Sequence, residues 1–307
     1  MSSHPAIAGL RLVLGGNVFG MTADRDASFA VLDTFYELGG RMIDTAEGYS
    51  AWVPGHKGGE SETMIGLWLD ARGVRADMRI ATKTNMYGKP GMLAPGKLAA
   101  ALEGSLERMR TDYVDLFYAH RDDPETPLEE VAEGFDALAK AGQIRSSGAS
   151  NFTAERLEAS LDAATRVGAM PYTVLQNEYN LVARGQFEGA VQDLCVKRGV
   201  IMLPYYGLAS GFLTGKYRSE ADLAGRARGA SVKRYLESGQ GVLAALDVVA
   251  AETGASQAQV ALAWINAKPG IGAPIASATS AEQVRELCKA AALTLEPEQV
   301  ARLDAAL

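Results

Sequence analysis

Asp44 and Tyr49 lie five positions apart in the segment MIDTAEGYS, where an apolar run gives way to Gly, Ser and Thr. An unperturbed tyrosine has a pKa of about 10 and is a poor acid at neutral pH. A lysine beside the phenol favours its ionised form and lowers that pKa, and a buried carboxylate keeps the lysine charged and in place. The pair therefore indicates half of a proton-transfer site, whose other half must come from elsewhere in the chain.

Lys83 in ATKT and His120 in DLFYAHRDD can supply the other half. The lysine would join Asp44 and Tyr49 in a tuned proton donor, and the histidine can donate a hydrogen bond to the same acceptor atom. A carbonyl group polarised in this way would accept hydride on its carbon. Because no side chain supplies hydride, this chemistry requires a nicotinamide. Each residue alone also has an ordinary interpretation, as a structural ion pair, a loop tyrosine or a hydrogen-bonded histidine.

Short β-type apolar runs recur along the chain and alternate with segments of helical spacing. The predicted strands cover 10–14, 41–43, 79–82, 113–118, 144–149, 172–175, 200–203 and 271–275. Helices are predicted over 60–72, 96–109, 128–140, 153–166, 187–198, 240–253, 256–267 and 281–291, and one more lies between the first two strands. In that helix Asp24 is placed to cap the start and Gly39-Gly40 to end it. A long polar loop is expected over 206–238.

Eight strands alternating with helices, without a linker rich in Pro, Gly and Ser, predict a single (β/α)8 TIM barrel over residues 1–307. The competing doubly wound sheet would need Gly where Asn17 stands in GGNVFG. Active sites of TIM barrels lie at the C-terminal ends of the strands. Polar residues at these predicted ends should therefore converge: Asp44, Tyr49, Lys83, His120, Ser150, Asn151, Gln176 and Tyr205.

Composition restricts the partners. A net charge of −7 argues against nucleic acid or an anionic membrane. No apolar run approaches the roughly 20 residues that span a bilayer, and the N-terminus lacks a signal-peptide pattern. Two distant cysteines, Cys195 and Cys288, exclude a disulfide framework, so a cytoplasmic protein is expected. The three histidines lack metal-ligand spacing and no metal is expected, although a carboxylate-only site stays open.

The motifs resemble those of the aldo-keto reductase superfamily over nearly the whole chain. MIDTAEGYS is similar to the family segment around its catalytic Asp and Tyr, ATKT to the segment with its lysine, and DLFYAHRDDPETPLEE to the segment with its histidine. The resemblance implies that Asp44, Tyr49, Lys83 and His120 are catalytic. It implies NADPH-dependent reduction of an aldehyde or ketone, a sugar carbonyl included, with Tyr49 as the general acid.

The resemblance also implies the cofactor contacts. GASNF and QNEYN are similar to segments that bind the nicotinamide carboxamide, and PYYGLASGFLTGK to the stretch that stacks on the nicotinamide and surrounds the pyrophosphate. The implied residues are Asn17, Val18, Ser150, Asn151, Gln176, Tyr205, Gly207, Leu208, Ser210, Gly211, Lys216, Thr279, Ser280, Gln283 and Glu286. Tyr206-Gly207 stands where the family often has Ser-Pro, which would alter the loop over the pyrophosphate.

At the C-terminus, Thr279, Ser280 and Gln283 stand where the family holds the 2′-phosphate of NADPH. The last two also have the spacing of a helix capping box, and both interpretations can hold because helix N-termini attract phosphate. No basic residue stands at 279, and Arg226 and Arg228 could compensate for its absence. NADPH is expected over NADH, with a preference weaker than is usual for the family.

Loop residues beside the predicted site are candidates to line the substrate: Phe19, Trp52, Tyr87 and Arg121. Trp52 belongs to SAWVPGHKGGE, a long insertion after Tyr49, and could cover an apolar substrate or stack on a sugar ring. The sequence leaves two other functions open. One is a cofactor-binding regulatory subunit on the same scaffold, since the family includes channel-associated members. The other is a metal-dependent barrel enzyme, which the scarcity of histidine disfavours. Oligomeric state is not predicted.

Overall fold

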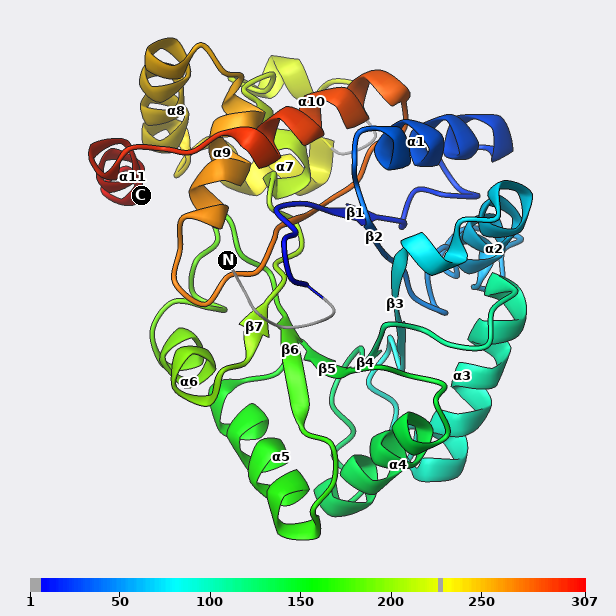
Figure 1. Cartoon of the computed structure of the whole chain (residues 1–307). Coiled ribbons are helices and arrows are strands. Elements are labelled where there is room, and N and C mark those ends of the chain that lie inside the picture. The colour runs from blue at the N-terminus through cyan, green and yellow to red at the C-terminus, as the bar shows by residue number, and fades with distance from the viewer. Residues whose placement is uncertain (1–6, 226–228) are drawn as a thin grey trace.

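In the computed structural model, which describes residues 7–225 and 229–307, the strands form one eight-stranded parallel sheet surrounded by helices (Figure 1). The strand order is β7-β6-β5-β4-β3-β2-β1-β8. The strands are β1 (Val13–Gly15), β2 (Met42–Asp44), β3 (Arg79–Thr84), β4 (Leu116–Ala119), β5 (Ser147–Ser150), β6 (Tyr172–Gln176), β7 (Ile201–Met202) and β8 (Ile275–Ala276).

Backbone hydrogen bonds join the two outer strands of this order. The Met202 N–H donates to the carbonyl of Gly270, and the Gly272 N–H donates to the carbonyl of Met202. The Ile275 N–H of β8 donates to the carbonyl of Pro204, just after β7. These bonds close the sheet, and the predicted (β/α)8 barrel is confirmed.

The helices follow the strands in the expected alternation. They are α1 (Arg25–Glu37), α2 (Glu60–Arg72), α3 (Pro95–Met109), α4 (Leu128–Lys140), α5 (Ala154–Val167), α6 (Ala190–Arg198), α7 (Gly229–Leu236), α8 (Gln240–Thr253), α9 (Gln257–Asn266), α10 (Ala281–Ala292) and α11 (Pro297–Asp304). Asp24 caps α1 as predicted, because its carboxylate accepts from the Ala27 N–H at 2.9 Å. Gly39 follows α1 at φ +85°, a backbone conformation that favours glycine.

Apolar side chains fill two layers. The interior of the barrel holds a compact cluster from alternating strand positions, including Val13, Met42, Ala81 and Val174. A larger cluster lies between the strands and the surrounding helices. Burial on both faces is the usual environment of a parallel sheet and explains why its strands read as continuous apolar runs.

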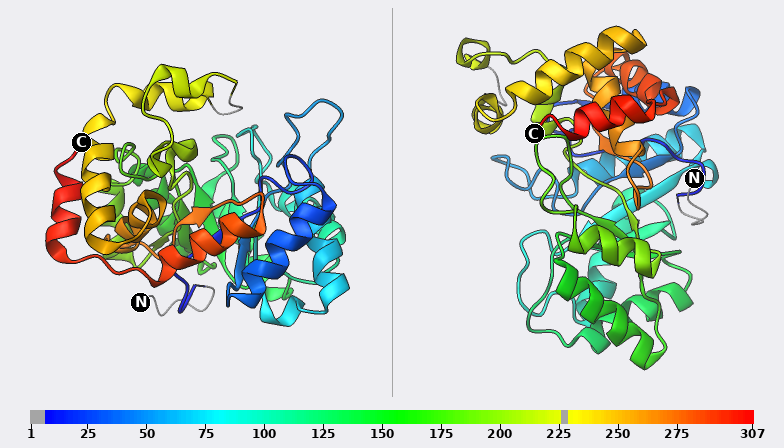
Figure 2. Two further views of the ribbon diagram at one scale, coloured as in Figure 1. Left: turned by 90° about the horizontal axis from the view of Figure 1, so that it is seen from above. Right: turned by 90° about the vertical axis from the view of Figure 1, so that its left-hand side faces the viewer.

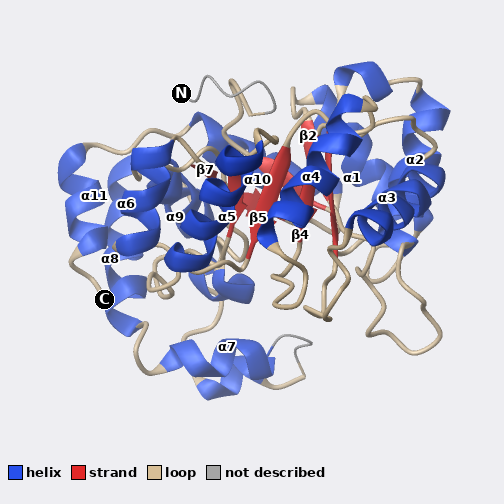
Figure 3. Cartoon of the chain, turned by 90° about the horizontal axis from the view of Figure 1, so that it is seen from below, coloured by secondary structure: helices blue, strands red, loops and turns tan. Residues whose placement is uncertain are grey.

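The region 206–238 differs from the predicted polar loop. It contains the 3₁₀ segments η2 (Ala209–Thr214) and η3 (Glu220–Leu223) as well as α7. Val232 and Tyr235 of α7 are buried, and the Tyr235 ring lies 5.7 Å from that of Phe212 in η2. This helix therefore forms by packing against a neighbour, which local composition did not indicate. Figure 3 shows α7 on the side of the barrel where the loops after the strands lie.

Other boundaries were also wrong. The strands predicted over 113–118 and 271–275 begin later, because their first residues make only isolated bridges, Val114 with Ile144 and Ile271 with Met202. The helix α11 was not predicted. It begins at Pro297 and buries only Leu303 within its eight residues, so few apolar residues mark it in the sequence.

Gly148 of β5 makes room for a tyrosine inside the barrel. Tyr118 of β4 is fully buried, and a Cβ added to Gly148 would lie 2.5 Å from its ring and 2.9 Å from the carbonyl oxygen of Val174. Real Cβ atoms do not approach so closely, so a ring and a strand would both have to move. Glycine at this position is thus a packing requirement of the barrel.

Gly148→Ala is expected to lower the free energy of unfolding by about 1–3 kcal/mol, the usual cost of overpacking a core. Gly96→Ala is the matched control, because Gly96 lies in α3 and a Cβ added to it would have no neighbouring atom within 4 Å. The control should be as stable as the parent or slightly more stable, since alanine favours helix. Denaturant unfolding of both variants tests this. Equal stability of the two would show that β4 and β5 adapt freely.

Candidate active site

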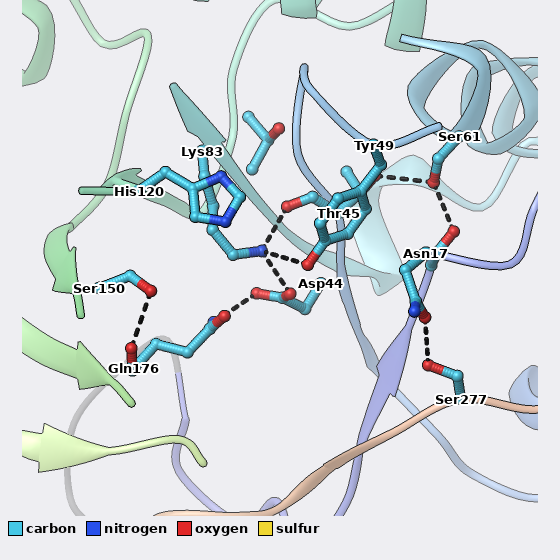
Figure 4. Close-up of polar contacts among 12 residues, drawn as sticks. Asn17, Asp44, Thr45, Tyr49, Ser61, Lys83, His120, Ser150, Gln176 and Ser277 are labelled. Carbon is cyan, nitrogen blue, oxygen red and sulfur yellow. Dashed lines mark hydrogen bonds and ion pairs between the residues drawn. The ribbon is translucent and has the colours of Figure 1, made fainter. Parts of the chain in front are cut away.

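Lys83 connects the predicted proton-transfer residues (Figure 4). Its ammonium donates to three oxygens: Asp44 Oδ1 at 2.5 Å, the Thr45 carbonyl at 2.6 Å and the Tyr49 hydroxyl at 3.1 Å. The side chains of Lys83 and Asp44 are 0% and 1% exposed. Since a buried charge is costly unless it is paired and hydrogen-bonded, three acceptors around one ammonium explain how the charge is tolerated.

The strand register places these groups together. Asp44 is the last residue of β2 and lies in register with Ala81 of β3, two residues before Lys83. Alternate strand residues share a face, so Lys83 lies on the same face as Ala81, which belongs to the barrel interior. Asp44 and Lys83 thus lie within the strand ends, whereas we expected them directly after the strands. Tyr49 comes from the loop after β2.

Burial and charge act in opposite directions on Tyr49. Burial is the larger influence and raises the pKa of Tyr49 above its ordinary value, although the charge of Lys83 lowers it. Burial also opposes the charged form of Lys83, but Asp44 and Tyr49 outweigh it and raise the pKa of Lys83. The expectation of a net lowered tyrosine pKa is therefore wrong for the free protein. Tyr49 is protonated throughout the neutral range.

His120 follows β4 and completes the group. Its ring centroid lies 6.0 Å from that of Tyr49 in an edge-on arrangement. Burial, together with the charges of Lys83 and Arg121, holds the pKa of His120 well below its ordinary value. The imidazole is therefore neutral at pH 7 and can donate from one ring nitrogen.

The polar residues at the ends of β5, β6 and β7 form one connected network. Gln176 Nε2 donates to Asp44 Oδ2 at 2.8 Å, and the Ser150 hydroxyl donates to the Gln176 carbonyl at 2.8 Å. Asn151 Nδ2 donates to the His120 carbonyl at 3.0 Å, and the Tyr205 hydroxyl donates to Asn151 Oδ1 at 2.7 Å. The predicted nicotinamide residues are thus held against the proton-transfer residues.

The segment predicted to surround the pyrophosphate has an unusual backbone. Ala209, Ser210 and Gly211 have successive φ values of +47°, +58° and +96°. Turns of this kind can form concave anion sites, although the N–H groups of Ala209 and Gly211 already donate to backbone carbonyls. Gly211 lies beside the Lys216 ammonium, which is 3.6 Å from the position of a Cβ, and its φ of +96° favours glycine. Leu208 is partly buried against the core, and Gly207 is buried.

The predicted 2′-phosphate residues begin α10. The Ser280 hydroxyl accepts from the Gln283 N–H at 3.3 Å, and Gln283 Oε1 accepts from the Thr279 N–H at 2.9 Å. The helix-capping interpretation therefore holds for Ser280, while Gln283 bonds one residue further back than a capping box requires. The carboxylate of Glu286 accepts a short hydrogen bond from the Ser256 hydroxyl, which directs it toward the start of α9.

Three residues after β1 differ in whether their side chains can contact a cofactor or a substrate. Asn17 Oδ1 accepts from the Ser277 hydroxyl at 2.5 Å, next to β8. Val18 is fully buried and its carbonyl accepts from the N–H groups of 21–23. Phe19 is also fully buried in the core. Its predicted place in the substrate lining is therefore wrong, because core side chains enclose the ring, and the side chain of Val18 cannot contact a cofactor for the same reason.

The other predicted lining residues lie at the surface. Trp52 is 53% exposed, and its ring lies 6.4 Å from that of Tyr49. It belongs to the long loop after Tyr49, which extends from the barrel (Figure 2). Tyr87 is 62% exposed, and Arg121 is exposed while its Nε donates to the Met86 carbonyl at 3.0 Å.

Sequence reasoning missed several supporting residues. Asn177 Oδ1 accepts from the Asn151 N–H at 2.8 Å, and its position next to Gln176 in QNEYN was an available signal. The Thr45 carbonyl accepts from Lys83, but a backbone acceptor leaves no trace in residue type. The pairing of Ser277 with Asn17 joins the two ends of the chain, so only the neighbouring position of β1 and β8 reveals it.

Among residues 7–225 and 229–307, no group of three or more His, Cys, Asp or Glu is arranged to hold a metal ion. In the same part of the chain no helix is long and apolar enough to cross a membrane. Arg226 and Arg228, predicted to compensate for the missing basic residue, lie outside the described residues.

A (β/α)8 barrel with Asp, Tyr, Lys and His gathered at the C-terminal ends of its strands defines a recognisable class of protein. The model of the Aldo/keto reductase family matches residues 11–307, and the chain belongs to this family. The chain is 31% identical to an aryl-alcohol dehydrogenase [NADP(+)] of Phanerodontia chrysosporium, over 93% of this chain and 77% of that one.

A solved structure supports the same assignment of fold. A thermostable aldo-keto reductase in complex with the inhibitor epalrestat superposes with a TM-score of 0.76 at 29% identity, over 99% of this chain and 95% of that one. A probable voltage-gated potassium channel subunit beta of Arabidopsis thaliana is 30% identical, over 89% of this chain and 84% of that one. The family thus includes oxidoreductase relatives and a relative named for a channel.

Proposed function

We propose that this protein is an NADPH-dependent reductase of aldehydes or ketones, with Tyr49 as the proton donor. The observation that carries the proposal is the contact of the Lys83 ammonium with both the Tyr49 hydroxyl at 3.1 Å and Asp44 at 2.5 Å. A protonated Tyr49 and a neutral His120 can both donate to one carbonyl oxygen. Bound NADPH supplies the hydride that the chain itself cannot provide.

The raised pKa of Tyr49 favours reduction. A phenol that stays protonated through neutral pH is in the form that a carbonyl oxygen needs when it becomes an alcohol. The Lys83 charge beside the phenol stabilises the phenolate that remains after proton transfer. Asp44 and Gln176 hold this lysine in place, since Gln176 Nε2 occupies the second oxygen of Asp44.

The residues after β7 and before α10 fit a cofactor with anionic groups. Lys216 places a cation beside Gly211, and the Ser210 hydroxyl lies in the same turn. At α10, the helix N-terminus and the Thr279 and Ser280 hydroxyls favour phosphate. Ser150, Asn151 and Gln176 would orient the carboxamide end, close to His120 and Asp44.

Turnover is the direct test. The purified chain should oxidise NADPH when mixed with at least one member of a panel of aldehydes, ketones and sugar carbonyls, followed by nicotinamide absorbance. The relative named as a channel subunit favours one alternative, a cofactor-binding regulatory subunit. Tight NADPH binding without turnover of any carbonyl would support that alternative and contradict the proposed activity.

The cofactor preference is a separate prediction. Titration by protein fluorescence quenching should show tighter binding of NADPH than of NADH. Gln283 Oε1 is occupied by the Thr279 N–H, which turns the amide nitrogen outward as a donor. Gln283→Glu keeps that acceptor but replaces the donor by a negative charge. We expect it to weaken NADPH binding by about 10-fold and to leave NADH binding unchanged. Equal affinities of the parent for both cofactors would contradict the 2′-phosphate assignment.

A further inference from the structure

We propose that Arg121 is a specificity-determining residue that binds an anionic group, a carboxylate or a phosphate, on the carbonyl substrate. This inference rests on the proposed function and identifies the class of substrate that the site takes. Arg121 directly follows His120, whose ring is 6.0 Å from that of Tyr49. Arg121 is exposed and its charge acts on both His120 and Tyr205, which places it at the rim of the same site.

Arg121 is held from one side and open on the other. Its Nε donates to the Met86 carbonyl of the neighbouring loop at 3.0 Å, and its stem lies 3.5 Å from the position of a Cβ on Gly88. Within the described part of the chain no carboxylate pairs with it. The Nε bond fixes the plane of the guanidinium, so the two terminal nitrogens are left for a planar anion, which an arginine binds through two parallel hydrogen bonds.

The acids next to Arg121 are already engaged elsewhere. Asp122 pairs with Arg156 at 2.8 Å. Asp123 is buried and accepts from the Gly91 and Leu93 N–H groups at 2.9 and 2.8 Å. In the sequence RDD the cation therefore stays uncompensated although two carboxylates follow it. In a chain with a net charge of −7, an unpaired cation beside a catalytic histidine is a feature that an anionic substrate would use.

Two further acids near the site are also occupied. Glu47 accepts from the Thr84 hydroxyl at 2.6 Å, and Glu178 pairs with Arg234 at 3.3 Å. Burial is the main reason that the pKa of His120 is low, and the charges of Lys83 and Arg121 lower it further, so the charge of Arg121 reaches His120. The exposed ring of Trp52 beside Tyr49 offers an apolar surface for the body of the substrate.

Matched substrates isolate the charge. The parent protein should reduce 4-formylbenzoate with a kcat/KM about 10-fold above that of its neutral methyl ester, a modest factor because Arg121 is exposed to solvent. 4-Formylphenyl phosphate distinguishes a carboxylate site from a phosphate site. The anionic aldehyde with the higher kcat/KM identifies the group that Arg121 binds. Arg121→Leu should abolish the preference, which is the ratio of the two kcat/KM values, so that any change in rate common to both substrates through His120 cancels. Arg121→Lys should retain part of the preference, because an ammonium binds anions without the bidentate geometry.

Lys89→Leu is the matched control, since it removes an exposed cation from the adjacent loop, 5.9 Å from the Tyr87 ring. It should keep the preference. The inference would be overturned if Lys89→Leu and Arg121→Leu lost the preference for the anionic aldehyde equally, or if the parent showed no preference. Reduction of the ester would still support the proposed function in either case. If no carbonyl of the whole panel is reduced, the proposed function fails. In that case fluorescence shows whether Arg121 binds an anion. 4-Formylbenzoate should quench the exposed Trp52, its methyl ester should not, and Arg121→Leu should remove the quenching.

Discussion

Tyr49→Phe is expected to lower the rate of carbonyl reduction by about 10²- to 10⁴-fold, the usual contribution of general acid catalysis. The substitution removes the hydroxyl that Lys83 contacts at 3.1 Å and leaves the ring beside Trp52 and His120. Packing is therefore preserved, and NADPH affinity should stay close to that of the parent. Steady-state reduction and fluorescence titration measure the two quantities separately.

Tyr118→Phe is the matched control for this prediction. Tyr118 is a second buried phenol near Lys83, whose ammonium lies 5.7 Å from its ring. Its hydroxyl is buried in the barrel interior beside the Gln176 side chain and is closed to solvent. Removing it should change the rate little. If Tyr49→Phe kept a tenth of the parent rate, or if Tyr118→Phe lost as much, Tyr49 would not be the proton donor.

Lys83→Met is expected to shift the pH dependence of alcohol oxidation toward higher pH. Oxidation needs the phenolate of Tyr49 as base. Burial already raises the pKa of Tyr49, and the charge of Lys83 is the influence that lowers it. Without the lysine this pKa rises further, so the rate falls most at neutral pH and partly recovers at alkaline pH. Reduction uses the protonated phenol and loses mainly the stabilisation of the phenolate formed by proton transfer.

Loss of stability accompanies this variant and has to be separated from the pH effect. Lys83→Met leaves a buried Asp44 without its cation, which can cost about 3–5 kcal/mol. Asp44→Asn/Lys83→Met removes both charges and should recover much of that stability, with a smaller shift of the pH profile because the charge of Asp44 itself raises the pKa of Tyr49. Thermal unfolding and the pH profile of NADP⁺-dependent oxidation together test this. An unchanged alkaline limb in the folded Lys83→Met variant would mean that Lys83 is only a structural ion pair.

The elements of the barrel were predictable because burial on both faces leaves a strong local pattern. Strands buried in a parallel sheet appear as apolar runs, and the last polar residue of each run marks its C-terminal end. This pattern identifies Asp44, Lys83 and Gln176 as polar residues at the ends of their strands. In the structure, two hydrogen bonds to Asp44 bring the three side chains together. The helix α7 escaped prediction because a neighbouring segment, around Phe212, provides the apolar surface that stabilises it.

By itself the sequence determined the barrel, the order of its strands and the residue types at their ends, since these depend on local periodicity and on chain order. Only the tertiary structure decided the environment of each side chain. Phe19 is enclosed although it lies in a loop near the site, and Asn17 bonds to Ser277 from the other end of the chain. The pKa of Tyr49 rises because groups from several strands remove water from it, and Arg121 stays unpaired because Asp122 binds Arg156 on α5. Desolvation and pairing depend on distances in space, which residue spacing along the chain does not contain.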